Sequence, residues 1–325
     1  MPVAQGTRES RKIGHAAGTS GRDAVGTHPR QDAAMKPGSQ NDYQQRIDHV
    51  LAHVQQAIES GAEPPDLHTL AALSHFSPYH FHRIYRALTG ESLGRSVSRL
   101  RLSRALHLLG DPARSVTEVA MQAGFGSSQA LARVLRDWLG QTASGLRADG
   151  SARLAALARL RQPAGTAVDA AVALQVSVVS LEPFEVIALR TLGQYDTLDT
   201  VYTELFGVAA ERGAVERIEA LYGIAWDDLR EVPRAALAFT SAIAVAGLDP
   251  PPPMQRQTWP GGRHACLRHT GSFLGLEDST DQLLAGWLPG SGEQLREAPV
   301  LYRYLDDPEQ VPEALLRTDI LVPLA

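Results

Sequence analysis

The sequence predicts a multidomain protein: an all-α domain with two tandem helix-turn-helix units, followed by an α+β domain made of two pseudo-symmetric βαββ halves. Apolar residues keep helical spacing from about residue 43 to residue 146. After Gln175 the pattern changes to short strand-like runs separated by two helical stretches. Within this second part, DDLREVPRAAL (227–237) returns as DDPEQVPEALL (306–316), which indicates an internal duplication.

Composition suggests where the domains begin and end. Residues 1–40 are rich in Gly, Ser, Thr, Arg and Gln and poor in large apolar side chains, so we expect a disordered tail. The helical domain should span 41–150. Residues 151–174 should form a linker that contains a connecting helix and the break PAGTA. The α+β domain should span 175–325.

The overall composition excludes several classes of protein. No run of about 18 apolar residues suits a membrane span, and no apolar signal segment begins the chain, so we expect a cytoplasmic protein that does not enter a membrane. The single cysteine, Cys266, excludes an internal disulfide framework and a four-cysteine zinc site. Apolar residues alternate along the segment that contains it. This pattern favours a thiol buried in a strand over a catalytic nucleophile. No cofactor or metal site is expected.

Charge is distributed unevenly along the chain. Residues 175–325 carry 11 basic and 22 acidic side chains, whereas residues 41–150 carry 11 basic and 10 acidic ones. An acidic domain is poorly suited to hold a nucleic-acid backbone, so the first half is left for that role.

Start and stop signals divide the helical domain into successive helices. Ile47, Val50, Val54 and Ile58 keep the spacing of one helix face. The expected boundaries, in chain order, are Gly61 (stop), Asp66 (cap), Ser77-Pro78 (start), Gly90 (stop), Asp111-Pro112 (break), Ser115 (start), Ser127 (start) and Gly140 (stop).

The helical domain contains the same short motif twice. AMQAGFGSSQALARVLRDWLG has a short helix, a glycine turn and a longer helix, as in a helix-turn-helix. An earlier copy is AALSHFSPYHFHRIYRALTG, in which Arg83, Arg86 and Gly90 recur as Arg133, Arg136 and Gly140. Two such units could present two recognition helices to successive segments of the major groove of double-stranded DNA.

Polar side chains on both second helices suit base reading. Ser128, Gln129 and Arg133 share one side of the later helix, and Gln and Arg are the side chains that pair bidentately with adenine and guanine. Tyr79, His82 and Arg83 lie on the corresponding face of the earlier helix. His80 and His82 could suggest a metal, but alternate residues diverge on a helix.

Six arginines lie within residues 77–104, against one acidic residue, Glu91. This local positive charge suits contact with phosphates. The alternative is an ordinary solvated helix face. The six are Arg83, Arg86, Arg95, Arg99, Arg101 and Arg104.

The α+β domain repeats the order strand, Gly-aromatic turn, helix, strand, Asp-Asp turn, strand. LRTLGQY (189–195) matches LRHTGSF (267–273), and the helical stretches are 198–210 and 276–287. The expected strands include 176–181, 185–192, 236–245, 264–271 and 317–324. A half-sheet with one helix cannot close a core alone, so the two copies should pair and leave a concave seam where a ligand could bind.

Aromatic residues gather near this seam. If YGIAWDD and LYRYLDD are both strands, Tyr302 and Tyr304 share a face, and their counterparts are Gly223 and Ala225. That pairing could leave a slot with an aromatic wall. The candidate ligand-binding residues are Tyr195, Trp226, Trp287, Tyr302 and Tyr304, with core packing as the alternative. The Asp-Asp pairs should start turns by bonding their own backbone; a metal or phosphate role is the alternative.

Residues 45–148 resemble the AraC-type DNA-binding domain. The resemblance is carried by LHTLAALSHFSPYHFHRIYRALTGESL, RLSRALHLL and SVTEVAMQAGFGSSQALARVLRDWLG. It implies base-facing roles for Tyr79, His82, Arg83, Ser128, Gln129 and Arg133. The chain departs from the family at Leu131 and Leu135, where phenylalanines are usual, and at residues 143–145, where a proline-containing turn is common.

Residues 176–324 resemble the GyrI-like effector domain. ALRTLGQYDTL, WDDLREVP, LRHTGSFLGL, GWLPGSG and YLDDPEQVPEALLRTDILVPL carry this resemblance. It implies two pseudo-symmetric halves with a small-molecule pocket between them, as in multidrug-responsive regulators. The family usually has a glutamate where this chain has Tyr302. A tyrosine can still face a cation or a flat aromatic ring, so aromatic, cationic and neutral ligands all stay open.

Three functional hypotheses follow. The leading one is a transcription regulator, not an enzyme, whose DNA-binding half is controlled by a small molecule bound in the second domain. The second is a hydrolase of reactive small molecules, which Tyr302 weakens because it removes the expected carboxylate. The third is a partner-binding module whose acidic half docks a basic surface, such as RNA polymerase or a topoisomerase.

Overall fold

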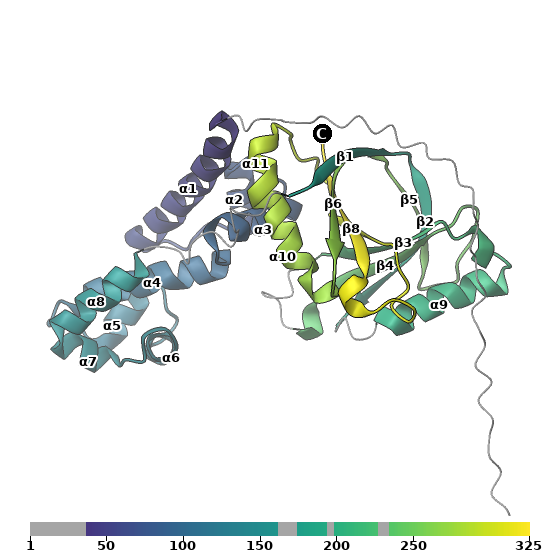
Figure 1. Ribbon diagram of the computed structural model, residues 1–325. Helices are drawn as coiled ribbons and strands as arrows, with labels where there is room; N and C mark the ends of the chain where they lie inside the picture. The colour runs from purple at the N-terminus through teal and green to yellow at the C-terminus, as the bar shows by residue number, and fades with distance from the viewer. Residues whose placement is uncertain (1–36, 162–173, 194–197, 227–233) are drawn as a thin grey trace, which may run out of the picture.

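The computed structural model describes residues 37–161, 174–193, 198–226 and 234–325. Two lobes make up this part of the molecule, a helical lobe and a lobe built on a curled sheet (Figure 1). The helices of the first lobe are α1 (Pro37–Ser60), α2 (Leu67–Leu73), α3 (Pro78–Thr89), α4 (Leu93–Leu109), α5 (Val116–Gln122), α6 (Ser128–Leu139), α7 (Ala143–Ala148) and α8 (Gly150–Leu160).

The expected caps form at most of the helix starts. Asp66 accepts a hydrogen bond from the backbone N–H of Thr69 at 2.8 Å, and Ser127 accepts one from Ala130 at 3.1 Å. Ser115 and Glu118 form a reciprocal capping box. Ser77 caps α3 without a side-chain hydrogen bond, and Pro78 fills the first turn. Local sequence therefore determines where these helices begin.

Two segments of the helical lobe differ from the expectation. Helix α1 already begins at Pro37, inside the range predicted as a tail. Helix α8 lies within the range predicted as a linker, yet its residues Ala156, Leu157 and Leu160 are buried against the core around α4, α5 and α6. Its apolar face explains this packing, because burying it removes that surface from water.

The second lobe is one antiparallel sheet of eight strands within the described residues, in the order β1-β6-β8-β7-β3-β4-β2-β5. The strands are β1 (Val176–Leu181), β2 (Phe184–Leu192), β3 (Ala220–Ala225), β4 (Ala238–Ala244), β5 (Gln255–Trp259), β6 (Gly262–Thr270), β7 (Leu301–Tyr304) and β8 (Arg317–Pro323). The expected strands all appear. Strand β5 was missed, because QRQTW is polar and exposed except for its tryptophan.

Helices cover one face of this sheet. Helix α9 (Leu198–Glu211) packs on β2 and β4, with Ile187 and Leu189 beneath it. On the other half, α10 (Leu276–Gln282), the π-helical turn η5 (Leu283–Trp287) and α11 (Leu288–Ser291) follow one another without a break. The alternate residues of β2, Val186 and Ala188, point to the opposite face and pack with Tyr222 and Trp259.

The two lobes share a hydrophobic core. Helix α1 packs along α11, and α3 packs against α10 and η5 (Figure 1). Ile47 and Ile84 of the helical lobe belong to the same buried cluster as Leu283, Leu288 and Tyr302 of the second lobe. The first helix-turn-helix unit is therefore joined to the sheet lobe, whereas the second unit has a core of its own around Leu106, Leu131 and Leu135.

Candidate nucleic-acid interface

Helix α6 is the more accessible of the two candidate recognition helices. Leu131 and Leu135 are fully buried beneath it, which fixes its orientation on the domain. Gln129, Arg133 and Arg136 are exposed on its other side, and Ser128 is half-buried. Long polar side chains on an anchored helix can reach base edges in a major groove. The two leucines occupy the positions where the resemblance leads one to expect phenylalanines, and they pack without loss of burial.

Helix α3 has the same internal construction. Phe81, Ile84 and Tyr85 are fully buried against the helical lobe. The helix ends at Gly90 with φ of 72°, just as α6 ends at Gly140 with φ of 66°, and glycine suits this left-handed conformation. Sequence and backbone thus give the two units matching second helices.

Arg83 does not point outward from α3. It is 2% exposed and forms an ion pair with Glu277 of α10, in the sheet lobe. The guanidinium donates from Nη1 to Oε2 and from Nη2 to Oε1, the latter at 3.2 Å. It also donates from Nη2 to the carbonyl oxygen of Ala225 at 3.2 Å and from Nη1 to the Tyr302 hydroxyl at 3.5 Å. All of these acceptors belong to the second lobe.

The expectation that Arg83 faces DNA therefore does not hold in this conformation. Its counterpart in the repeat, Arg133, is exposed, so the difference comes from the sheet lobe and not from the helix-turn-helix unit itself. His82 and Arg86 are half-buried, and the side chain of Tyr79 lies outside the described part. The sequence could not indicate this burial, because Arg83 and Glu277 are 194 residues apart.

Tyr302 also bonds the Glu277 carboxylate, and Thr280 lies beside Tyr302. The Tyr302 hydroxyl donates to Oε1 of Glu277 at 3.4 Å and lies 3.2 Å from the Thr280 hydroxyl. Burial, together with the nearby Glu277 carboxylate, raises the pKa of Tyr302 to about 12. Tyr302 therefore stays protonated at neutral pH and remains a hydrogen-bond donor.

A buried histidine lies one turn before Arg83. His80 is fully buried, and its Nε2 lies 3.1 Å from the carbonyl oxygen of Arg296 in the second lobe. Burial lowers the pKa of His80 to about 4, with the Arg83 charge acting in the same direction. The imidazole is thus neutral at pH 7. A metal role with His82 was considered from the sequence, and no group of three potential metal ligands occurs among the described residues.

The six arginines of the predicted phosphate-binding face do not form one exposed face in this structure. Besides Arg83, three of them are held by the protein itself. Arg99 pairs with Glu91, Arg101 pairs with Glu63 at 2.6 Å, and Arg104 donates to the carbonyl oxygen of Ile58. Arg95 is exposed, and its guanidinium lies 4.6 Å from the centre of the Trp138 ring.

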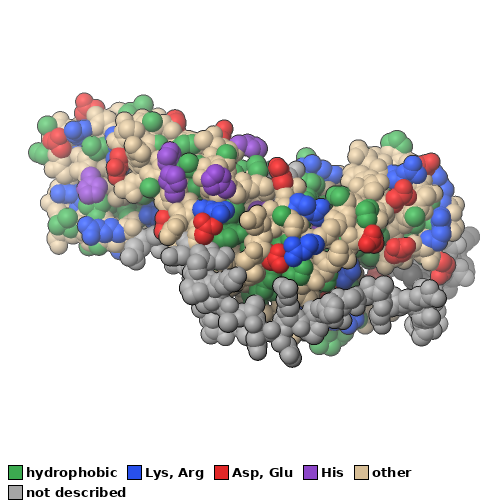
Figure 2. Space-filling model, turned by 90° about the horizontal axis from the view of Figure 1, so that it is seen from above, with side chains coloured by type: hydrophobic (Ala, Val, Ile, Leu, Met, Phe, Trp, Pro, Cys, Tyr) green, Lys and Arg blue, Asp and Glu red, His purple; other side chains and the backbone are tan. Residues whose placement is uncertain are grey.

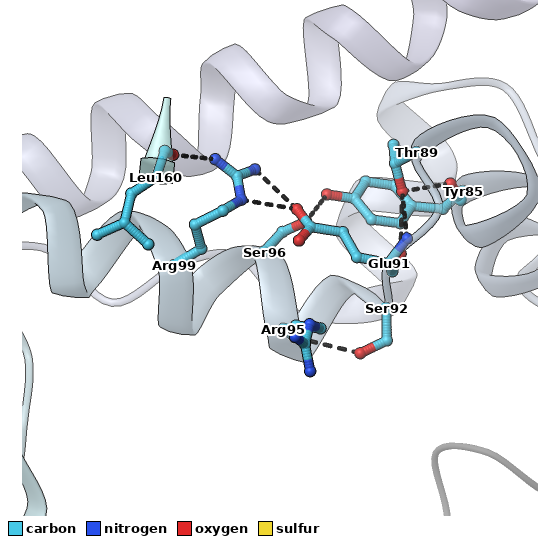
Figure 3. A network of polar contacts seen from close by, with 8 residues as sticks. All are labelled: Tyr85, Thr89, Glu91, Ser92, Arg95, Ser96, Arg99 and Leu160. Atoms are coloured by element: carbon cyan, nitrogen blue, oxygen red, sulfur yellow. Dashed lines mark hydrogen bonds and ion pairs between the residues drawn. The ribbon is translucent and has the colours of Figure 1, made fainter. Parts of the chain in front are cut away.

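The Glu91–Arg99 pair is the centre of a buried network (Figure 3). Oε1 of Glu91 accepts hydrogen bonds from Arg99 at 2.7 and 2.9 Å and from the Ser96 hydroxyl at 2.6 Å. Arg99 also donates to the Leu160 carbonyl oxygen at 3.0 Å. Since Leu160 ends α8 and Glu91 follows α3, this network fixes the helical lobe and leaves Arg99 no role on the surface.

Many arginines of the helical lobe bond groups of the protein itself, which leaves fewer of them to give the surface a basic character. On the face shown in Figure 2, basic and acidic side chains of the described residues are interspersed along both lobes.

A cavity of about 380 Å³ lies among α4, α6 and α8 and is lined by Arg95, Trp138 and Arg159, among others. It is open and polar, and nothing in its lining indicates a particular ligand.

Three of the predicted ligand-binding aromatics, Tyr302, Tyr304 and Trp287, belong to one cluster, and Trp226 belongs to another. Tyr302 and Tyr304 share the helix-covered face, as predicted, with Tyr302 buried and Tyr304 half-buried. Trp287 packs on the same cluster. Trp226 is half-buried, donates to the Thr240 hydroxyl at 2.8 Å and has the Arg190 guanidinium 5.0 Å from its ring centre. Tyr195 lies outside the described residues.

The slot expected beside Gly223 is filled. A Cβ atom at Gly223 would lie 2.5 Å from the Tyr304 hydroxyl oxygen and 2.6 Å from Phe239 Cζ. The space that the missing side chain leaves is therefore taken by two aromatic rings of the protein. Tyr304 also meets Phe273 edge-on, with ring centroids 5.1 Å apart. The prediction of an empty slot was wrong, because a packed interior leaves few voids.

The second Asp-Asp pair has the predicted turn role. Asp306 accepts hydrogen bonds from the backbone and side chain of Arg317 at 2.7 to 2.9 Å. Asp307 accepts from the backbone N–H of Glu309 at 2.9 Å. Both carboxylates thus hold the loop between β7 and β8. The first pair, Asp227 and Asp228, lies outside the described residues.

The lone thiol is not activated. Cys266 lies half-buried in β6, and burial raises its pKa to about 11, so the thiolate needed for nucleophilic attack is scarce at neutral pH.

Among the helices that the structure describes, none has the length and apolar character to cross a membrane.

Comparisons with known protein families agree with this division into two lobes. Residues 70–149 match a helix-turn-helix domain family, and residues 174–325 match the GyrI-like small molecule binding domain.

Individual relatives match parts of the chain. The probable transcriptional regulator YgiV of Escherichia coli K12 is 35% identical over 108 residues, which cover 32% of this chain and 66% of YgiV. The regulatory protein SoxS of the same organism is 28% identical over 32% of this chain and 95% of SoxS. Among solved structures, the EcmrR–DNA complex in EcmrR-RPo covers 80% of this chain and 99% of its own, at 12% identity and a TM-score of 0.40. This chain thus spans less than two thirds of YgiV, the first of these relatives.

Proposed function

We propose that this chain, which joins an AraC-type helix-turn-helix domain to a GyrI-like domain, is a transcription regulator that binds specific sites on double-stranded DNA and responds to a small molecule. The curated relatives are named transcriptional regulators, which supports a DNA-binding role over an enzymatic one. DNA contact would come first from α6, and the small molecule would act through the second lobe.

The observation that carries the DNA-binding role is the presentation of α6. Its apolar side is buried on the core, its N-terminus is capped by Ser127, and Gln129 and Arg133 extend into solvent. Arg can bond two acceptors of guanine, and Gln can bond adenine through a donor and an acceptor. We infer that these two side chains read bases, and that Ser128 and Arg136 contact the backbone beside them.

We also infer that the second lobe consists of two pseudo-symmetric halves. Its strand order supports this inference. The strands correspond in pairs, β1 with β5, β2 with β6, β3 with β7 and β4 with β8. If the members of each pair are swapped, the order β1-β6-β8-β7-β3-β4-β2-β5 becomes the same order read backwards. The sequence repeats fall on matching elements, since LRTL ends β2 and LRHT ends β6. A ligand-responsive site would then lie where the halves meet, between β3 and β7.

The DNA-binding role can be tested by selecting genomic fragments with the full-length protein at near-physiological salt and footprinting those that bind. We expect Arg133→Ala to weaken specific binding by about 1–3 kcal/mol and to relax the base preference at one position. The control is Arg161→Ala, which removes the same charge from an exposed position after α8. Equal, non-specific weakening by both variants would reject base reading by α6, and no enriched fragment would reject the function.

A further inference from the structure

The two candidate recognition helices differ in the exposure of a matching arginine, and their own sequences do not explain this difference. Arg83 and Arg133 occupy matching positions of the two repeats, yet Arg83 is 2% exposed and Arg133 is exposed. The cover over Arg83 comes from α10 and η5 of the sheet lobe, which pack against α3. In this conformation the Arg133 side chain is accessible from solvent and the Arg83 side chain is not.

The contact on Arg83 is built for a planar cation. Both oxygens of the Glu277 carboxylate accept from the guanidinium. Nη2 also donates to the Ala225 carbonyl oxygen, and Nη1 also donates to the Tyr302 hydroxyl. Glu277 is 5% exposed and Tyr302 2% exposed. Fork-shaped bidentate pairing of this kind selects guanidinium over a compact ammonium.

Glu277 bonds groups at the place where we infer the ligand-responsive site, between β3 and β7. Ala225 is the last residue of β3, and Tyr302 lies on β7, the strand that pairs with β3 at the middle of the sheet. The guanidinium of Arg83 thus reaches the junction of the two half-sheets.

We propose that Glu277 is a binding site for planar cations, that Arg83 fills it as an internal ligand which keeps α3 away from DNA, and that an amidinium or guanidinium compound displaces Arg83 and releases α3. This inference rests on the proposed regulator function and adds to it the ligand class and the coupling. One guanidinium cannot bond Glu277 and a DNA base or phosphate at the same time, so docking and DNA contact by α3 exclude each other.

The small net stability of a buried ion pair suits a contact that can open. Two charges removed from water lose hydration that their mutual attraction recovers only in part, so a buried ion pair contributes little net stability. Removing one partner is costly, because the other charge stays buried alone. A ligand that pairs with Glu277, together with DNA phosphates that pair with Arg83, leaves neither charge uncompensated. The coupling requires tighter ligand binding in the open state than in the docked state.

The test compares full-length Glu277→Gln with Glu211→Gln, which makes the same substitution at an exposed position at the end of α9 in the same lobe. Hydrogen exchange measured by mass spectrometry reports docking without any DNA. We expect Glu277→Gln to speed exchange in peptides that cover α3 and α10 and to leave the central strands β3 and β4 protected. Glu211→Gln should behave like the wild type. On a selected site, the footprint of Glu277→Gln should lengthen by about one helical turn of DNA. The affinity of this variant for the site should rise about tenfold, as is typical when a competing internal contact is removed.

The ligand class is tested on the wild-type protein with benzamidine, an aromatic amidinium, and with benzamide as its neutral isostere. Benzamidine should speed exchange in α3 and lengthen the footprint, benzamide should do neither, and Glu277→Gln should not respond to benzamidine. Unchanged α3 exchange in both the variant and the benzamidine sample would overturn the proposal. So would faster α3 exchange with an unchanged footprint. Failure of the wild type and every variant to bind any DNA site would instead overturn the regulator function on which the proposal rests.

Discussion

Gly223 and Tyr302 lie directly opposite each other where β3 and β7 pair at the centre of the eight-stranded sheet. They are also the two positions that the 79-residue repeat of the sequence brings into correspondence. One half of the lobe thus supplies a phenol where the other supplies no side chain. The pair lies beside the Arg83 guanidinium, which bonds the Tyr302 hydroxyl.

Substituting Gly223 by alanine should destabilise the second lobe. The new Cβ would lie 2.5 Å from the Tyr304 hydroxyl oxygen, a contact that side chains do not tolerate. We expect a loss of about 1–3 kcal/mol in the free energy of unfolding, measured with urea. Tyr304→Phe in the same chain should recover part of the loss, because it removes the nearest atom. Gly207→Ala in α9, where nothing lies within 4 Å, should instead stabilise by about 0.5–1 kcal/mol.

In the turns of the two helix-turn-helix units, removing a glycine and introducing one should have opposite effects on stability. Gly124 follows α5 with φ of 79°, whereas the matching residue after α2 is His75 with φ of 54°. A side chain in this left-handed region costs about 1–2 kcal/mol. Gly124→Ala should therefore lower the unfolding temperature and His75→Gly should raise it, each measured by thermal denaturation. A fall in both variants would mean that the His75 side chain has a stabilising contact that outweighs its backbone strain.

Two neighbouring arginines of α4 should differ greatly in their effect on stability. The Arg99 side chain is 6% exposed and its partner Glu91 2%, so Arg99→Ala leaves a buried carboxylate alone and should cost about 3–5 kcal/mol. The Glu63 partner of Arg101 is 84% exposed, so Arg101→Ala should cost at most about 1 kcal/mol. Urea unfolding of both variants measures the difference. Similar losses would contradict the structural role assigned to the network in Figure 3.

Docking of the two lobes should weaken in acid through His80. The pKa of this buried imidazole falls from 6.5 to about 4, with burial as the main cause. An exposed His80 takes up a proton near pH 6.5 and the docked one does not, so the contribution to docking is complete above pH 6.5. It is lost progressively as the pH falls toward 4. The other groups that face His80 are the Arg83 charge and the backbone oxygens of Arg296 and Ala298.

Hydrogen exchange of α3 at pH values between 4 and 7, corrected for the intrinsic pH dependence of exchange, measures this effect. We expect protection to decrease by up to about 3 kcal/mol across the window. His80→Gln should flatten the profile, whereas His68→Gln, at an exposed position of α2, should leave it unchanged. A profile that His80→Gln does not alter would assign the acid sensitivity to another group.

The sequence by itself determined the local structure and the order of the domains. Caps such as Asp66 and Ser127, the glycines that end α3 and α6, and the period of the buried residues all act within a few positions of the chain. The repeats indicated two helix-turn-helix units and strands on both sides of each Asp-Asp turn. Strand β5 escaped detection, since an exposed polar edge strand has no apolar alternation.

Only the tertiary structure decided which polar residues remain available for binding. Arg83 and Arg133 look equivalent in the sequence, but the packing of α10 on α3 buries one of them. Glu277 had no distinguishing pattern in LGLEDSTDQLLAGW, and its partner lies 194 residues earlier. The reason is physical: local signals set backbone conformation, whereas burial and charge pairing depend on surfaces that meet only after the whole chain has folded.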